Sequence, residues 1–179
     1  VMKATFIAML VLLLPAALEA SPTMGIYFTY VPGTMCYDPA PLTVFDAYVF
    51  GHDIQCYLDA SEFKVVYPDR VLETGFTAPD GAMVLGDPGT GVSIAYWPPM
   101  DGWNPGYNLL CTLHLYSIPG CDGVANAFIK IVPHHVTGLD KGSCWPENEL
   151  FEFTGLTSVL CPSQFSVQTM TWGSIKSLF

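Results

Sequence analysis

The chain has 179 residues and carries 16 acidic against 6 basic side chains, which gives a formal net charge of −10 at neutral pH. A nucleic-acid-binding surface needs clustered Lys and Arg, so this composition argues against a nucleic-acid partner. The length beyond a short leader suits one domain that can bury a core.

The first twenty residues have the three parts of a secretory signal peptide. Met2-Lys3 form a short positive end, the run from Ala4 to Leu18 is apolar apart from one Thr, and Ala20 is a small residue at the expected cut. We therefore expect a signal-peptide helix in residues 1–20, handled by the export machinery, and a secreted or cell-surface product. An uncleaved anchor is the alternative, but the apolar run is shorter than the roughly twenty residues of a membrane span. No stable membrane span is expected after cleavage.

Residues 21–162 consist of short apolar segments separated by Pro- and Gly-rich turns. The clearest is 107–117, where residues alternate between apolar and more polar side chains in the period of two that is typical of a strand. Pro98-Pro99 is expected to end one strand, and Ala78-Pro79-Asp80-Gly81 is a strong turn signal. Strands are expected at 24–30, 42–50, 61–67, 71–76, 92–97, 107–117, 124–132, 150–153 and 156–160, the last two joined as a small hairpin through Thr154-Gly155.

This pattern predicts an all-β fold. No stretch has a sustained apolar period of 3.6 residues, and Pro and Gly recur too often for helices. About eight or nine short strands with regular turns favour an antiparallel two-sheet sandwich, with a closed barrel as the second choice.

Six cysteines remain in residues 21–162: Cys36, Cys56, Cys111, Cys121, Cys144 and Cys161. An even number in an exported chain is typical of disulfides, although fifteen pairings are possible and the sequence does not choose among them. The scattered spacing does not fit a zinc site, whose ligands are usually close in sequence.

No motif marks a catalytic or metal site. There is no Gly-x-Ser-x-Gly elbow, and the four histidines are better explained as strand or loop residues than as ligands. Single carboxylates in loops make a structural calcium ion possible in principle but not expected, and no other cofactor is expected. The sequence therefore predicts a protein that is not an enzyme, and a small hydrolase with an unmarked site is the weakest alternative.

Two features could bind a partner. Trp97 and Trp103 flank a Pro-rich loop with Tyr96 and Tyr107 nearby, and exposed indoles there would offer a platform for a sugar ring or a protein. In residues 163–179, Trp172, Ile175 and Phe179 fall on one face if the segment is helical, which would suit a sorting or docking tail. A last strand is the alternative for this tail.

Two resemblances add to these patterns. The segments Met24-Gly-Ile-Tyr-Phe28, Ser61-Glu-Phe-Lys-Val-Val66, Gly91-Val-Ser-Ile-Ala-Tyr96 and Cys161-Pro162, with the ending Thr171-Trp-Gly-Ser-Ile-Lys-Ser-Leu-Phe179, resemble uncharacterised exported proteins of environmental bacteria. There the ending looks like a sorting tail. The strand layout also resembles cohesin-like and other immunoglobulin-like surface modules, a likeness of architecture only.

Together these observations predict a secreted or cell-surface β-sandwich that binds a protein or assembles on the surface without catalysing a reaction. A carbohydrate-binding module that uses exposed tryptophans is one alternative. A structural subunit of an extracellular assembly, held together by the tail, is the other.

Overall fold

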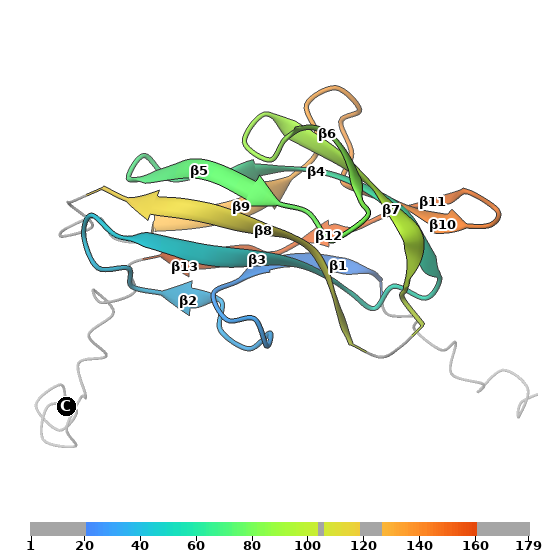
Figure 1. Cartoon of the computed structure of the whole chain (residues 1–179), viewed down its shortest axis with the longest axis horizontal. Coiled ribbons are helices and arrows are strands. Elements are labelled where there is room, and N and C mark those ends of the chain that lie inside the picture. The colour runs from blue at the N-terminus through green and yellow to red at the C-terminus, as the bar shows by residue number, and fades with distance from the viewer. Residues whose placement is uncertain (1–20, 104–105, 119–126, 161–179) are drawn as a thin grey trace, which may run out of the picture.

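A computed structural model describes residues 21–103, 106–118 and 127–160, and this part of the chain consists of strands and turns only (Figure 1). The all-β prediction is therefore confirmed, with thirteen strands in place of the expected eight or nine. They are β1 (Thr23–Tyr27), β2 (Cys36–Tyr37), β3 (Val44–His52), β4 (Tyr57–Val66), β5 (Val71–Thr77), β6 (Met83–Asp87), β7 (Gly91–Asp101), β8 (Tyr107–Ser117), β9 (Ala127–Val132), β10 (Lys141–Trp145), β11 (Glu149–Glu152), β12 (Thr154–Gly155) and β13 (Thr157–Leu160). The predicted signal peptide and the predicted tail lie outside the described residues.

The strands form two sheets that face each other, as the sandwich prediction required. The first sheet has the order β12-β1-β3-β8-β5, and the second has the order β11-β10-β4-β9-β13-β2. In the second sheet β7 pairs with β4 and β6 pairs with β7, so that β6 is an outer strand. Most pairs are antiparallel, but the two-residue contacts of β1 with β12 and of β13 with β2 are parallel.

The core lies between the inner faces of these sheets. Phe63 and Val65 of β4 face the core, as do Leu113 and Leu115 of β8, and all four are at most 1 % exposed. The alternation of β8 shifts near its start, where a bulge opposite Val49 and Phe50 leaves both Leu110 and Cys111 buried. A bulge adds one residue to a strand and turns the next side chain to the other face, which simple alternation does not foresee.

Three expectations about individual strands are wrong. Pro98-Pro99 does not end β7, because these residues fall in an irregular stretch where Ala95 pairs with Ala60 and Met100 with Leu58. Proline is tolerated at such bulges, where the ladder needs no N–H. The expected hairpin through Thr154-Gly155 is also absent, since β11 pairs with β10 and β12 pairs with β1.

The third is the set of strands, since β2, β6, β10 and β12 were not expected. In β10, Lys141 and Gly142 are residue types that are depleted in strands. Gly142 is required there because an added Cβ would collide with the ring of Phe151 on the paired strand β11. The strand is thus specified by a contact between strands and not by its own sequence.

One disulfide joins Cys56 to Cys144, with an S–S distance of 2.05 Å. It ties the chain just before β4 to the end of the neighbouring strand β10. The prediction that all six cysteines are paired is wrong for Cys36, an exposed free thiol, and for Cys111, a buried one. Cys111 occupies a core position between the sheets, where cysteine acts as a small apolar residue. Cys121 and Cys161 lie outside the described residues.

No helix in the described ranges has the length and apolar character needed to cross a membrane.

Candidate functional site

The four aromatic residues selected from the sequence lie in different environments. Tyr96 is buried, and its hydroxyl lies 2.6 Å from that of Ser61, so it is part of the core. Tyr107 is partly exposed and its ring lies 4.6 Å from the imidazole of His52. Trp97 and Trp103 are 72 % and 61 % exposed, as a binding platform requires. Trp103 lines the groove described next and Trp97 does not, and a platform shared by the two indoles stays a prediction.

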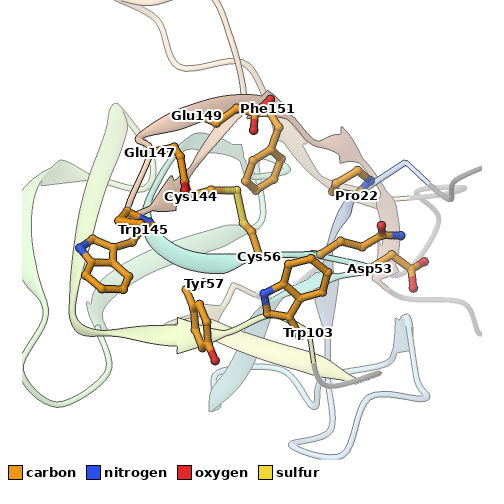
Figure 2. A pocket seen from close by; sticks show the side chains of 12 residues that line it. Pro22, Asp53, Cys56, Tyr57, Trp103, Cys144, Trp145, Glu147, Glu149 and Phe151 are labelled. Carbon is orange, nitrogen blue, oxygen red and sulfur yellow. A yellow bond between two sulfur atoms is a disulfide. The ribbon is translucent and has the colours of Figure 1, made fainter.

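This groove is open and has a volume of about 560 Å³. Figure 2 shows the Cys56–Cys144 disulfide at its centre, with Trp145 on one side and Trp103 on the other. Tyr57 and Phe151 add two further rings to the lining. The groove therefore presents four aromatic side chains around a rigid covalent cross-link.

Backbone pairing holds these rings in place. Trp145 ends β10 directly opposite Tyr57, which begins β4. Trp103 follows β7, and its backbone N–H donates to the carboxylate Oδ1 of Asp101 at 3.1 Å. Gly102 between them donates its N–H to the Cys56 carbonyl at 3.0 Å, and a Cβ at this position would collide with that carbonyl. Trp103 is thus fixed beside the disulfide by a turn that only glycine fits.

The charged side chains of the groove are all acidic. Asp53, Glu147 and Glu149 line it, and no Lys, Arg or His is among the described residues that do. Asp53 lies 2.8 Å from the imidazole Nδ1 of His52. Neither Glu147 nor Glu149 forms an ion pair within the described residues. The groove is therefore aromatic and negatively charged.

A second surface lies on the outer face of the sheet formed by β6, β7, β4, β10 and β11, which we call the five-strand face. The strand register places one residue of each strand in a row across it: Met83, Ala95, Ala60, Ser143 and Leu150. The next row is Leu85, Ser93, Glu62, Lys141 and Glu152.

Exposure differs between the edges and the middle of the five-strand face. Met83, Leu85 and Leu150 at the edges are 72 %, 77 % and 64 % exposed. The small residues Ala60 and Ser143 in the middle help to line a shallow hollow of about 260 Å³. Exposed apolar side chains at both edges of a hollowed sheet make this face a candidate interaction surface.

A hydrogen-bonded chain of catalytic residue types lies elsewhere. His114 Nδ1 is 2.8 Å from Asp46 Oδ1, and His114 Nε2 is 2.8 Å from Thr77 Oγ1. The order carboxylate, imidazole, hydroxyl is that of a hydrolase triad. All three side chains are on the first sheet, and none lines either hollow. The arrangement explains His114 as a satisfied strand histidine.

Two partly buried carboxyl groups with raised pKa values also lie outside the groove. Burial raises the pKa of Glu73, with a further raising effect from nearby Asp87 and a lowering effect from Tyr67. Burial likewise raises the pKa of Asp140. No group of three or more His, Cys, Asp or Glu side chains in the described part of the chain is arranged to hold a metal ion.

Sequence reasoning did not select Trp145 as a binding residue. It follows Cys144, and Pro146 and Glu147 come next. The sequence shows an aromatic residue next to a cysteine and an acidic turn, which could have indicated a binding residue. It does not show which cysteine pairs with Cys144. Without the disulfide to Cys56, nothing in the sequence places Trp145 near Trp103.

No protein-family model matches the sequence, and no curated protein matches it significantly. The fold is similar to that of solved cohesin modules. The sixth cohesin of scaffoldin B from Acetivibrio cellulolyticus, described in complex with a Cel5 dockerin, has a TM-score of 0.53 at 11 % identity, over 79 % of this chain and 98 % of that one. A non-cellulosomal cohesin from Archaeoglobus fulgidus gives 0.51 at 9 % identity, over 79 % and 91 %. The third ScaB cohesin of R. flavefaciens, in complex with a group 1 dockerin, gives 0.50 at 7 % identity, over 79 % and 95 %.

At these identities the similarity establishes the fold alone. The cohesin-like architecture expected from the strand layout is therefore confirmed. The resemblance of the ending 171–179 to a sorting tail stays a prediction.

Proposed function

We propose that this protein is a non-catalytic module that binds a separate protein through the five-strand face. The observation that carries the proposal is the row of side chains from Met83 to Leu150, apolar at both edges and small in the middle. The similar fold of two cohesins described in complex with dockerins supports it.

The shape of this face suits a folded partner. Ala60 and Ser143 leave a hollow into which a partner can insert a side chain, while Met83 and Leu85 at one edge offer apolar area to cover. Interfaces gain most of their affinity from a few central contacts that are shielded from water by their surroundings. Met83 and Leu85 are the most exposed apolar side chains of these two rows, so a partner that covers them buries apolar area, and replacing both with Asp should weaken binding.

The experiment is photo-crosslinking from this face. A photoreactive phenylalanine analogue replaces Ala95 in the full chain, which is then irradiated with extract from the cells that encode it. We expect one discrete crosslinked protein, competed by excess unlabelled wild-type chain but not by Met83→Asp/Leu85→Asp. The matched control places the analogue at Leu72 on β5 of the opposite sheet, 52 % exposed. Equal crosslinking from both faces, or failure of the wild type to compete, would refute the proposal.

Glycan binding is the second candidate function, favoured by the exposed Trp103 and Trp145 in the groove. Indole faces stack on sugar rings and bury a large area at low entropic cost. Retention on polysaccharide columns tests this function. It predicts that Trp103→Ala and Trp145→Ala are not retained, whereas Trp97→Ala, exposed but outside the groove, is retained as wild type.

We also propose that the chain is exported and acts outside the cytoplasm. The signal-peptide pattern of residues 1–20 supports this, together with the acidic, cysteine-containing composition. Mass spectrometry of the mature protein should find an N-terminus near Ser21. The same measurement shows whether residues 163–179 are retained, as an assembly subunit requires, or removed, as a sorting tail allows.

A further inference from the structure

The aromatic groove has a charge pattern that the proposed protein-binding function does not explain by itself. Its lining combines the indoles of Trp103 and Trp145 and the phenol of Tyr57 with the carboxylates of Glu147 and Glu149. Figure 2 shows the two indoles on either side of the disulfide and both glutamates along one rim. Electron-rich ring faces and carboxylates both attract positive charge.

We infer that this groove binds a lysine or arginine side chain presented by a protein partner, which makes it a second contact site beside the five-strand face. The inference rests on the proposed protein-binding function. A cation beside an indole is stabilised by the negative potential of the ring face, and tryptophan is the most effective aromatic residue for this. The flanking carboxylates then accept hydrogen bonds from the ammonium or guanidinium group.

Charge complementarity favours a basic segment over the other occupants. Glu147 and Glu149 are exposed and form no ion pair within the described residues, so a bound cation would have no internal competitor at these side chains. The whole chain adds a net charge of −10, which steers basic partners toward it. An acidic or phosphorylated segment would be repelled from the same rim.

The backbone that carries the aromatic residues of the groove is fixed by a disulfide and by hydrogen bonds. The disulfide joins the start of the strand that carries Tyr57 to the end of the strand that carries Trp145. The backbone of Trp103 is held by the hydrogen bond from its N–H to Asp101 Oδ1 and by the Gly102 turn. Side chains on a rigid framework lose little conformational freedom when a ligand binds, which raises affinity.

The test uses the full chain and a synthetic probe. The probe is a twelve-residue peptide in which Lys and Arg alternate with Gly and Ser, and the reference peptide carries Gln at every basic position. Binding is measured by calorimetry and by the change in tryptophan fluorescence. We expect the basic peptide to bind, the Gln peptide not to bind, and the affinity to fall steeply as salt is raised.

Matched variants separate the groove from the general acidity of the chain. Glu147→Gln/Glu149→Gln should weaken binding by about tenfold, since charged hydrogen bonds are lost. Asp69→Asn/Asp80→Asn removes two exposed charges outside the groove and should change affinity by less than about twofold, the effect of long-range attraction alone. Likewise Trp103→Ala and Trp145→Ala should each cost about fivefold, while Trp97→Ala should have no effect.

Several outcomes would overturn the inference. Equal losses in the two charge variants would show attraction without a site, and binding of the Gln peptide would show that the cation is not recognised. Retention on a polysaccharide column that depends on Trp103, with no peptide binding, would assign the groove to a glycan. Met83→Asp/Leu85→Asp should leave peptide binding intact, so failure at the groove is distinguishable from failure of the five-strand face.

Discussion

Replacing both cysteines of the disulfide tests how the groove is held together. Cys56 and Cys144 are 88 residues apart in the sequence, so the bond closes a large loop in the unfolded chain. For a loop of 88 residues the chain-entropy relation gives a stabilisation of about 4.6 kcal/mol at 25 °C. Because total stabilities are about 5–15 kcal/mol, the Cys56→Ala/Cys144→Ala variant should lose a large part of its stability.

Urea unfolding followed by far-ultraviolet circular dichroism measures this loss. We expect the free energy of unfolding to fall by about 3 to 5 kcal/mol, at the predicted size or somewhat below it. Cys36→Ala, which removes an exposed free thiol, is the control and should change stability by less than about 0.5 kcal/mol. A loss below about 1 kcal/mol in the double variant would refute the reasoning, because loop closure could not then be a main source of stability. If the double variant does not fold, wild type unfolded with and without reductant gives the same comparison.

Three further predictions follow from how deeply individual side chains are buried. Leu113→Ala on β8 leaves a cavity in a site with no exposure and should cost about 2–5 kcal/mol in urea unfolding, whereas Leu72→Ala at the surface should cost well under 1 kcal/mol. Burial raises the pKa of Glu73, so its contribution to stability is present below its ordinary pKa of 4.5 and is lost as pH rises through the folded value. Glu73→Gln should therefore gain stability relative to wild type between pH 4 and pH 7, and an unchanged difference across this range would contradict the assignment. Iodoacetamide should modify Cys36 in the native protein but not Cys111, whose thiol is buried and has a raised pKa, and mass spectrometry after digestion distinguishes them.

The sequence predicts those parts of the fold that local patterns determine. The strand at 107–117 was predicted with the bounds of β8 because apolar and more polar residues alternate in its sequence, although the bulge near Leu110 interrupts the alternation of burial. Val71–Thr77 was expected one residue shorter, and the turn at Pro79–Gly81 ends it as the sequence indicates. These elements depend on side-chain period and turn chemistry, which are readable without knowing the neighbours.

The parts that were missed depend on contacts between distant residues. Gly142 is needed in β10 because Phe151 lies against it, and Pro98 is tolerated in β7 because it lies within the irregular stretch of that strand. The same holds for the groove, since Trp145 joins Trp103 through a disulfide whose partners are 88 residues apart. The Pro-rich loop in the sequence indicated exposed tryptophans. Which tryptophans lie close together depends on the strand pairing and the disulfide, which the sequence does not give.

The two binding surfaces are carried by the same pair of strands, and this has a consequence for how a partner binds. On β4, Tyr57 lines the groove and Ala60 lies on the five-strand face, while on β10 the corresponding residues are Trp145 and Ser143. A single partner that covers the face and extends a basic segment past the ends of these strands would contact both. Its affinity would then fall in Glu147→Gln/Glu149→Gln as well as in Met83→Asp/Leu85→Asp.

A double-mutant cycle decides between one partner and two. Once crosslinking has identified a partner, its affinity is measured for each pair of substitutions and for the four combined. Losses from both pairs of substitutions show that one partner spans both surfaces, and deviation of the combined loss from their sum measures how strongly the contacts depend on each other. A partner insensitive to the glutamate substitutions would show that the groove serves a different ligand, because a basic segment docked there cannot lose both carboxylates without weaker binding.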